Sequence, residues 1–384
     1  MLSKLTRLFG NKSDTDTPSD IMALTDTSIL AALNALTDPH TGKSYVAAKN
    51  VKNIQISEHT LALDVVLAYP AQSQFAAVRT AFETALTPLA EGRQLEIRVS
   101  SQITSHAAQR GVPLLPGVKN IIAVASGKGG VGKSTTAVNL ALALAAEGAR
   151  VGLLDADIYG PSQPLMLGLQ GQRPETPDGK HLKPVENYGI QTMSIGYLVD
   201  NDQAMVWRGP MVSQALQQLL NDTQWDNLDY LVIDMPPGTG DVQLTLAQKV
   251  PVTGAVIVTT PQDIALLDAR KGVTMFQKVG VPILGLVENM AIHICSNCGH
   301  AEHIFGEGGA TKMAADYGVE VLGSLPLDIG IRQAVDAGKP SVVAEPEGKV
   351  ADLYKAIARR VAIRVGEKAQ DFSSKFPKIV IQNN

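Results

Sequence analysis

The apolar positions in the first quarter of the chain alternate between the spacing of helices and the spacing of strands. Four segments show this, in the order helix, strand, helix, strand. They are residues 29–36, 61–67, 75–89 and 95–99. Apolar residues three and four apart share a helix face, whereas alternate residues share a strand face. The order predicts a small α+β domain at residues 21–105, followed by a linker at residues 106–118 that contains two glycines and two prolines.

Beyond the linker the pattern changes to short, continuous apolar runs separated by helical segments. The runs are residues 121–125, 151–154, 230–233, 255–259, 283–287 and 321–322. Strands of a parallel sheet are buried on both faces and have this continuous apolar character, and the helices between them form the crossovers. The pattern predicts an α/β domain with a doubly wound, mostly parallel sheet at residues 119–365, closed by a helix at residues 347–365. Polar tails are expected at residues 1–20 and 366–384.

The charge and the length of the apolar runs exclude several classes of protein. The chain has 33 basic and 37 acidic side chains, a formal net charge of -4, so no nucleic-acid partner is expected. Its longest apolar stretch, residues 137–146, is well short of the roughly 20 residues of a membrane-spanning helix. The first ten residues are too short and too polar for a secretory signal. We therefore expect a cytoplasmic protein without stable membrane association.

The segment after the first apolar run has the glycine and lysine spacing of a P-loop. Its residues are Gly127, Lys128, Gly129, Gly130, Val131, Gly132, Lys133, Ser134 and Thr135. A predicted strand precedes it and a predicted helix follows it, so backbone N–H groups and the positive helix end can surround phosphate oxygens. Lys133 is expected to reach the β and γ phosphates, and the Ser134 hydroxyl to ligate magnesium. The motif predicts ATP and Mg²⁺ as cofactors.

Acidic residues follow two of the other predicted strands. Asp234 ends the run at residues 230–233, which is the position of a Walker B acid that holds magnesium through water. Asp155 and Asp157 follow the run at residues 151–154, at the carboxyl edge of the predicted sheet, and one of them is expected to orient the attacking water. The loop at residues 236–241 is rich in proline and glycine and is a candidate switch loop.

The P-loop, with its extra lysine at the second position, resembles the deviant Walker A loop of the group that contains the nitrogenase iron protein and the MinD and ParA ATPases. The resemblance implies a homodimer in which Lys128 reaches the phosphates of the partner subunit. It also implies that Asp157 orients the attacking water and that Asn289 contacts adenine. The catalytic candidates are then Lys128, Lys133 and Asp157, and the magnesium candidates are Ser134, Asp155 and Asp234.

Three further segments resemble the Mrp/ApbC branch of this group: residues 155–162 (DADIYGPS), 234–241 (DMPPGTGD) and 288–290 (ENM). The resemblance implies an ATP-dependent carrier that receives an iron-sulfur cluster from a donor scaffold and passes it to recipient apoproteins. The small domain is similar to one found in several iron-sulfur assembly factors, through its Asp38-Pro39 turn and the order of its elements. Where many relatives of that domain have a cysteine beside a proline, this chain has Tyr69-Pro70.

The two cysteines of the chain, Cys295 and Cys298, form one Cys-x-x-Cys pair. Without an export signal, this pair indicates metal or redox chemistry rather than a disulfide scaffold. Iron-sulfur clusters and structural zinc usually take four protein ligands, so one chain supplies half of a four-cysteine set. A twofold dimer pairs a surface with its own copy, and the four thiolates would suit a 4Fe-4S cluster.

The residues alone leave other sites and functions open. A zinc site within one chain would add two of His293, His300 and His303 to the cysteines, and a redox dithiol is a further alternative. The function could then be that of a positioning or regulatory ATPase like MinD and ParA with a structural zinc site, or that of a scaffold for which hydrolysis is incidental. The cluster carrier is the function that the resemblance favours.

Overall fold

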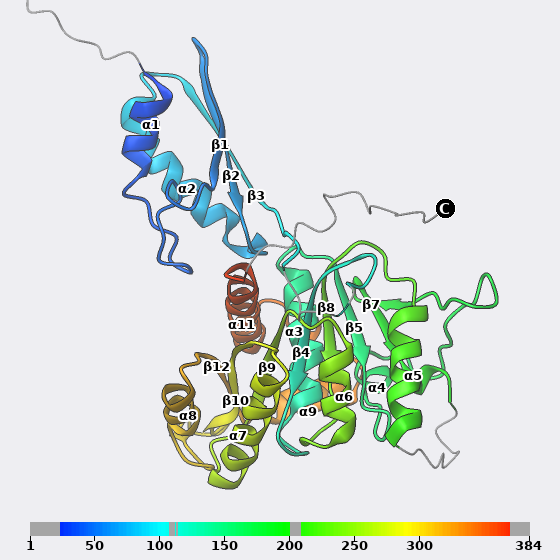
Figure 1. The fold of residues 1–384 in the computed structure, drawn as a ribbon. Helices are drawn as coiled ribbons and strands as arrows, with labels where there is room; N and C mark the ends of the chain where they lie inside the picture. Colours follow the sequence, from blue (N-terminus) through cyan, green and yellow to red (C-terminus); the bar gives the residue numbers. More distant parts are fainter. Residues whose placement is uncertain (1–23, 107–111, 113, 200–208, 369–384) are drawn as a thin grey trace, which may run out of the picture.

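The computed structural model describes residues 24–106, 112, 114–199 and 209–368. They form a small unit with a three-stranded sheet and a large unit with a nine-stranded sheet (Figure 1). The predicted tail at residues 1–20 and most of the predicted tail at 366–384 lie outside the described residues.

The small unit has two helices on one side of its sheet (Figure 1). The strand order is β1-β2-β3, with β1 antiparallel and β3 parallel to the central β2. Every second side chain of β2 is buried, as the alternation in the sequence predicts. The elements are α1 (Asp26–Leu33), β1 (Val51–Ile56), β2 (Thr60–Leu67), α2 (Phe75–Leu86) and β3 (Gln94–Ser101), with 3₁₀ turns at Gln72–Gln74 and Thr87–Leu89.

Two details of the small unit differ from the sequence-based expectation. The first helix begins three residues before residue 29 and ends at Leu33, because Thr25 and Ser28 form a capping box that fixes its start. The strand β1 was not predicted, since it is an edge strand whose apolar positions do not alternate regularly, and its pairing with β2 shifts register between Lys52 and Gln55.

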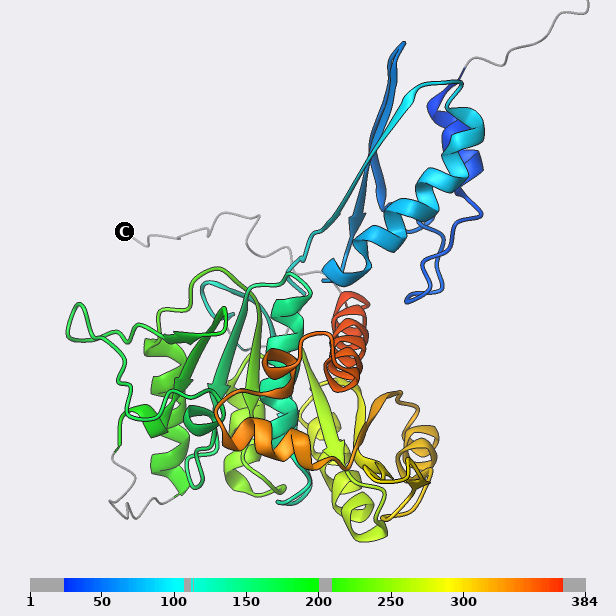
Figure 2. The ribbon, with the colours of Figure 1, turned by 180° about the vertical axis from the view of Figure 1, so that it is seen from behind.

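The large unit is a mostly parallel sheet with helices on both faces, so the predicted doubly wound fold is confirmed (Figures 1 and 2). The strand order is β11-β10-β9-β4-β8-β5-β7-β6, and β12 also pairs with β10. The pairs β6–β7 and β10–β11 are antiparallel. The strands are β4 (Val118–Ala125), β5 (Val151–Asp155), β6 (Val185–Asn187), β7 (Ile190–Ser194), β8 (Leu228–Asp234), β9 (Gly254–Thr259), β10 (Ile283–Ile294), β11 (Ala301–Glu302) and β12 (Val321–Pro326).

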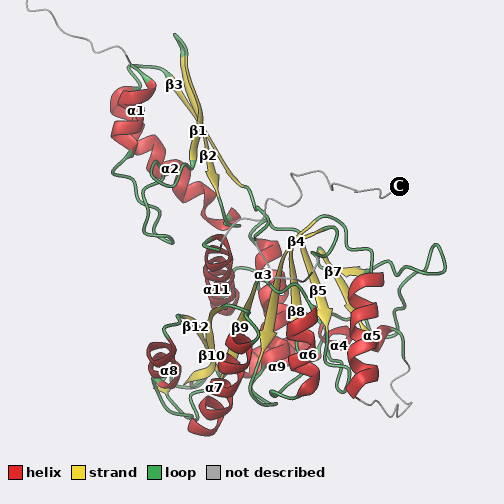
Figure 3. Cartoon of the chain, in the orientation of Figure 1, coloured by secondary structure: helices red, strands yellow, loops and turns green. Residues whose placement is uncertain are grey.

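The helices of the large unit enclose the sheet as two outer layers (Figure 3). One layer contains α3, α10 and α11, which contact one another, and the other contains the neighbouring helices α5 to α8. The helices are α3 (Lys133–Ala146), α4 (Gln163–Met166), α5 (Gly209–Asp222), α6 (Asp241–Lys249), α7 (Asp263–Lys278), α8 (Gly309–Tyr317), α9 (Ile329–Asp336), α10 (Ser341–Ala344) and α11 (Lys349–Gly366), with a 3₁₀ turn at Ile195–Tyr197. Among the described residues, no helix combines the length and the apolar character needed to cross a membrane.

The central strands are buried along their whole length, as the apolar runs predict. Each residue of β5, β8 and β9 is buried. The strand β10 is longer than the apolar run at residues 283–287, because it continues to Ile294. Met290 has a φ of 58°, a left-handed conformation that bends the strand without ending it.

The two units meet at the carboxyl end of the P-loop helix α3. Glu147, fully buried, follows α3 and accepts hydrogen bonds from the Ser73 backbone nitrogen (3.1 Å) and hydroxyl (2.7 Å). Arg359 of α11 donates to the same carboxylate at 2.5 Å and to the Ser73 hydroxyl at 3.2 Å. Figures 1 and 2 both place the small unit at one end of α11. The 3₁₀ turn that precedes α2 is therefore attached to the end of the helix that begins at the P-loop.

We expect Glu147→Gln to lower the free energy of unfolding by about 3–5 kcal/mol, because it leaves the buried Arg359 guanidinium without its counter-charge. Urea denaturation at neutral pH measures this change. Glu367→Gln is the matched control, since it removes the exposed partner of Arg364, and such surface pairs are worth about 0–1 kcal/mol. Equal effects of the two substitutions would contradict the assignment of Glu147 as the structural contact.

Candidate functional site

The P-loop joins β4 to α3 and leaves an open face over its glycines. Gly132 is the N-cap of α3, with a φ of 82°, and Gly130 has a φ of 83°, both in the left-handed region that glycine adopts without strain. Gly129 and Gly130 are exposed, and a Cβ atom on either would meet nothing within 4 Å. The backbone N–H groups of the loop are thus accessible to an anion, and the start of α3 adds its positive end.

Lys133 is buried at the start of α3 and makes an ion pair with Asp234 at the end of β8. The same ammonium donates to the Ser134 hydroxyl at 3.1 Å. The structure therefore brings together the predicted phosphate lysine and two of the predicted magnesium ligands. Three segments that are far apart in the sequence meet here, because β4, β8 and β5 are adjacent parallel strands whose carboxyl ends share one edge.

Asp155, at the end of β5, lies beside this pair and is fully buried. Its carboxylate accepts hydrogen bonds from the backbone nitrogens of Asp157 (3.2 Å), Ser162 (3.0 Å) and Gln163 (3.1 Å), and from the Ser194 hydroxyl (3.1 Å). Burial, together with the nearby charge of Asp234, raises the pKa of Asp155 to about 7, although these hydrogen bonds oppose the shift.

Asp157 lies two residues further along, at the same edge of the sheet, and is only partly buried. Its pKa is raised chiefly by burial, while Lys133 acts in the opposite direction. The position is compatible with the predicted water-orienting role, which stays a prediction.

Gln163, which the sequence analysis did not single out, crosses the middle of the site. Its amide nitrogen donates to the Ser134 carbonyl at 3.1 Å and to Asp234 Oδ2 at 2.9 Å. The residue therefore connects the first turn of α3 to the end of β8. A glutamine between Ser162 and Pro164 belongs to no motif of phosphate or metal binding, so only the three-dimensional contacts identify it.

Asn289, the predicted adenine contact, is buried and donates from Nδ2 to the Val131 carbonyl of the P-loop at 2.9 Å. A Cβ atom on Gly132 would lie 2.2 Å from this nitrogen. The side chain therefore supports the P-loop from β10, and its contact with adenine stays a prediction.

The remaining members of the P-loop segment and the candidate switch loop lie close by. Lys128 is half-buried, and its carbonyl accepts a hydrogen bond from the Ser126 hydroxyl at 2.9 Å. Gly238, in the loop at residues 236–241, donates its backbone N–H to the Ser126 carbonyl at 3.1 Å. Thr135 accepts from the Asn139 amide at 3.0 Å through its carbonyl. The candidate switch loop is thus attached to the residue that precedes the P-loop.

The cysteine pair lies on a hairpin between β10 and β11. The Cys295 nitrogen donates to the His300 carbonyl at 2.9 Å, and the Gly299 nitrogen donates to the Cys295 carbonyl at 2.8 Å. Both thiols are free, and Cys298 is exposed. Backbone N–H groups of Cys298 and Asn297, followed by the Cys298 thiol, hydrogen-bond to Cys295 and lower the pKa of its thiol. The hairpin favours a Cys295 thiolate, which is the form that binds metals.

Two of the histidines considered for a zinc site contact backbone carbonyls through Nδ1. His293 Nδ1 lies 3.1 Å from the Leu327 carbonyl, and His303 Nδ1 lies 2.8 Å from the Ala291 carbonyl. Within the described residues, no group of three or more His, Cys, Asp or Glu side chains is arranged to hold a metal ion. His293 belongs to β10, whereas His300 and His303 lie on either side of β11.

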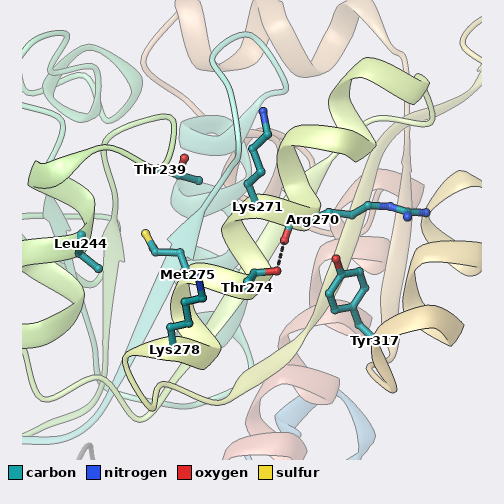
Figure 4. Close-up of a pocket in the computed structure, with 8 residues that line it drawn as sticks. All are labelled: Thr239, Leu244, Arg270, Lys271, Thr274, Met275, Lys278 and Tyr317. Atoms are coloured by element: carbon teal, nitrogen blue, oxygen red, sulfur yellow. Dashed lines mark hydrogen bonds between the residues drawn. The ribbon is translucent and has the colours of Figure 1, made fainter.

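A separate pocket of about 460 Å³ opens over α7, between Leu244 of α6 and Tyr317 of α8 (Figure 4). The α7 side chains in it include Arg270 and Lys271, which are ion-paired with Asp316 and Asp268. The pocket borders the candidate switch loop through Thr239, but it contains none of the residues predicted for nucleotide or cluster binding.

The comparisons with known proteins agree with this arrangement. A family model described as NUBPL iron-transfer P-loop NTPase matches residues 117–362, and one described as iron-sulfur cluster assembly protein matches residues 26–99. The iron-sulfur cluster carrier protein of Escherichia coli strain K12 is 55% identical over 317 residues, which are 83% of this chain and 86% of that protein. The iron-sulfur cluster transfer protein NUBPL of Mus musculus is 52% identical over 282 residues, 71% of this chain and 88% of that protein.

Among solved structures, the nucleotide-binding protein from Archaeoglobus fulgidus in complex with ADP is similar to the large unit. It is 39% identical, with a TM-score of 0.54, and the match covers 62% of this chain and 93% of that one.

We expect Gly127→Ala to lower the free energy of unfolding by about 1–3 kcal/mol and to weaken nucleotide binding, because its Cβ would lie 2.1 Å from the Asp268 backbone in α7. Gly129→Ala is the matched control, because its Cβ would meet nothing within 4 Å and the stability should change by less than about 0.5 kcal/mol. Urea denaturation compares the two. A Gly127→Ala protein as stable as the control would show that the P-loop is not held against α7.

We expect Asp155 to make the magnesium-free protein less stable as the pH rises from about 4 to about 7. The folded pKa of about 7 lies above the ordinary value of 3.8, so in this interval the folded protein binds more protons than the unfolded chain. The stabilisation that protonated Asp155 contributes is complete below about pH 4 and is lost as the pH rises through about 7. Asp155→Asn should flatten this part of the profile, measured by urea denaturation in EDTA at several pH values. An unchanged profile would mean that Asp155 is ionised throughout.

Proposed function

We propose that this chain, which belongs to the NUBPL iron-transfer P-loop NTPase family, binds and hydrolyses ATP and carries a 4Fe-4S cluster as cargo from a donor scaffold to recipient apoproteins. The observation that carries the proposal is the hairpin of Cys295 and Cys298, which continues a strand that also contacts the P-loop. We assign the nucleotide chemistry to residues 119–365 and the recognition of protein partners to residues 21–105, in the cytoplasm.

The thiols of the hairpin have the chemistry that a transferable cluster needs. Hydrogen bonds to Cys295 favour its thiolate, and Cys298 is exposed, so a bound cluster is accessible to a recipient protein. One chain supplies two thiolates, and a cluster of this type takes four. We therefore propose that a homodimer holds the cluster between two copies of the hairpin.

Exposed apolar side chains support the proposed contact between two copies. Ile294 precedes Cys295 and is 57% exposed, and Ile304, just after β11, is 49% exposed. Ile264 and Leu267, in the first turns of α7, are 67% and 58% exposed. Because α7 begins at the same carboxyl edge of the sheet as the P-loop helix, a partner there would cover both the nucleotide edge and the hairpin. An interface of this kind would also place Lys128 at the phosphates of the other subunit.

The residues at the P-loop fit magnesium and a nucleoside triphosphate. The open glycine backbone suits phosphate oxygens, and the Ser134 hydroxyl with the carboxylates of Asp155 and Asp234 is an oxygen donor set that magnesium prefers. Gln163 Oε1 and Ser162 Oγ are buried in the described structure without hydrogen-bond partners, which suits a hydrated cation beside them. Magnesium would neutralise charge on the phosphates, while Lys133 would bind their oxygens and Asp157 would orient the attacking water.

The strand β10 offers a physical connection between hydrolysis and the cluster. Asn289 contacts the P-loop carbonyl of Val131, and Cys295 follows six residues later in the same chain segment. We propose that the nucleotide state moves Asn289 with the P-loop, and that the hairpin moves with β10. Cluster affinity would then differ between the nucleotide states.

We expect Cys298→Ala to abolish cluster binding and to leave ATP hydrolysis within about twofold of the unchanged protein, because Cys298 is not among the residues proposed to bind nucleotide or magnesium. Anaerobic reconstitution with iron and sulfide, followed by iron, sulfide and zinc counts, measures the first effect. About four irons per dimer are expected for the unchanged protein, and fewer than one for the variant.

Ser296→Ala, in the same hairpin, is the matched control and should bind a full cluster. One zinc per chain without visible absorbance, in the unchanged protein, would make the hairpin a structural zinc site and would overturn the carrier proposal.

A further inference from the structure

Gln163 is as buried as a core residue, yet it hydrogen-bonds to residues of the candidate site. It is 1% exposed, at the start of the short helix α4. Its backbone nitrogen donates to Asp155 Oδ2 at 3.1 Å, while its side-chain nitrogen donates to Asp234 Oδ2 at 2.9 Å and to the Ser134 carbonyl at 3.1 Å. Gln163 thus contacts all three residues predicted to ligate magnesium, and its side chain reaches a predicted ligand group at Asp234.

The chemistry of the contacts fixes which way the amide of Gln163 faces. Both neighbours of Nε2 are acceptors, a carboxylate oxygen and a backbone carbonyl, so the two amide hydrogens are both used there. A flipped amide would place Oε1 against these same two acceptors, with no hydrogen between them. The orientation with Nε2 toward Asp234 is therefore the only one in which the contacts are favourable.

This orientation leaves Gln163 Oε1 as a buried acceptor without a donor. Among the described residues, the few buried side-chain polar atoms without partners include this oxygen and Ser162 Oγ on the preceding residue. A buried carbonyl oxygen without a hydrogen bond is unfavourable, and buried polar groups in proteins are normally satisfied by protein or by ordered water. A donor that arrives with the ligand would satisfy Oε1.

We propose that Gln163 is a positioning residue for magnesium: its Nε2 orients the Asp234 carboxylate, and its Oε1 accepts a hydrogen bond from the hydration shell of the ion. The inference rests on the proposed nucleotide function. Magnesium usually keeps several of its waters in protein sites, and those waters are donors only. Residues that orient metal ligands typically change metal affinity by 10–100-fold when they are replaced. Gln163 should therefore set the magnesium affinity of the nucleotide complex and have little effect on nucleotide binding without metal.

The test measures binding rather than hydrolysis. Fluorescent ADP is bound to the full chain, first in EDTA and then during a magnesium titration, and the magnesium concentration at half-saturation is compared between proteins. We expect Gln163→Leu and the isosteric Gln163→Met to raise this concentration about tenfold, with nucleotide affinity in EDTA changed less than about twofold. Gln191→Leu, a matched substitution on β7 whose side chain hydrogen-bonds to the Asp226 backbone, should leave both quantities unchanged.

The outcomes separate the inference from the function on which it rests. If the unchanged protein shows magnesium-dependent binding and the folded Gln163 variants show the same half-saturation, Gln163 has no role toward the metal and the inference is overturned. If the unchanged protein binds no ADP, or binds it without any effect of magnesium, the proposed nucleotide function itself fails. The Met variant keeps the side-chain volume, so the comparison remains available if the Leu variant is unstable.

Discussion

The buried ion pair of Lys133 and Asp234 is the contact on which the geometry of the candidate site depends. Lys133 is 6% exposed and Asp234 is fully buried, so neither charge is compensated by solvent. Removing one partner of such a pair usually costs about 3–5 kcal/mol. The pair holds the first turn of α3, and with it the end of the P-loop, against the end of β8. Asp155 and Asp157 add negative charge at the same edge, and the backbone N–H groups around Asp155 offset part of it. The site therefore combines one buried ammonium with two buried carboxylates and one that is only partly buried.

The strand β10 has a second organising role, because it belongs to the nucleotide edge at Asn289 and to the cysteine hairpin at its end. The left-handed Met290 bends the strand between these two points. A strand that ended at Asn289 would leave the cysteines on a free loop. The observed strand instead ties the hairpin to the sheet by pairing with β11, so the positions of the thiols depend on the same backbone as the P-loop contact.

The sequence predicted those parts of the fold in which a single local pattern dominates. The buried runs of β5 and β8 and the glycine spacing of residues 127–135 were identified because burial on both faces and phosphate binding leave local signals. The edge strand β1 was missed because its apolar residues do not alternate regularly. The extension of β10 was missed because it continues past Met290, whose left-handed conformation cannot be read from the sequence. Gln163 and Glu147 were missed for another reason. A glutamine beside a proline and a glutamate at a helix end are ordinary on a surface, and only tertiary contacts show that these two are buried.

The charged residues of the contact between the two units all lie on one side of it. Both charged members of it, Glu147 and Arg359, belong to the large unit, whereas the small unit contributes a hydroxyl and backbone N–H groups of Gln72 and Ser73. The large unit therefore carries a preassembled, charge-neutral attachment point, and the small unit can leave it without separating opposite charges. Water can replace a hydroxyl and two N–H groups far more easily than it can replace a counter-ion. Breaking these hydrogen bonds would expose the carboxyl end of α3, which is the opposite end of the helix from the P-loop.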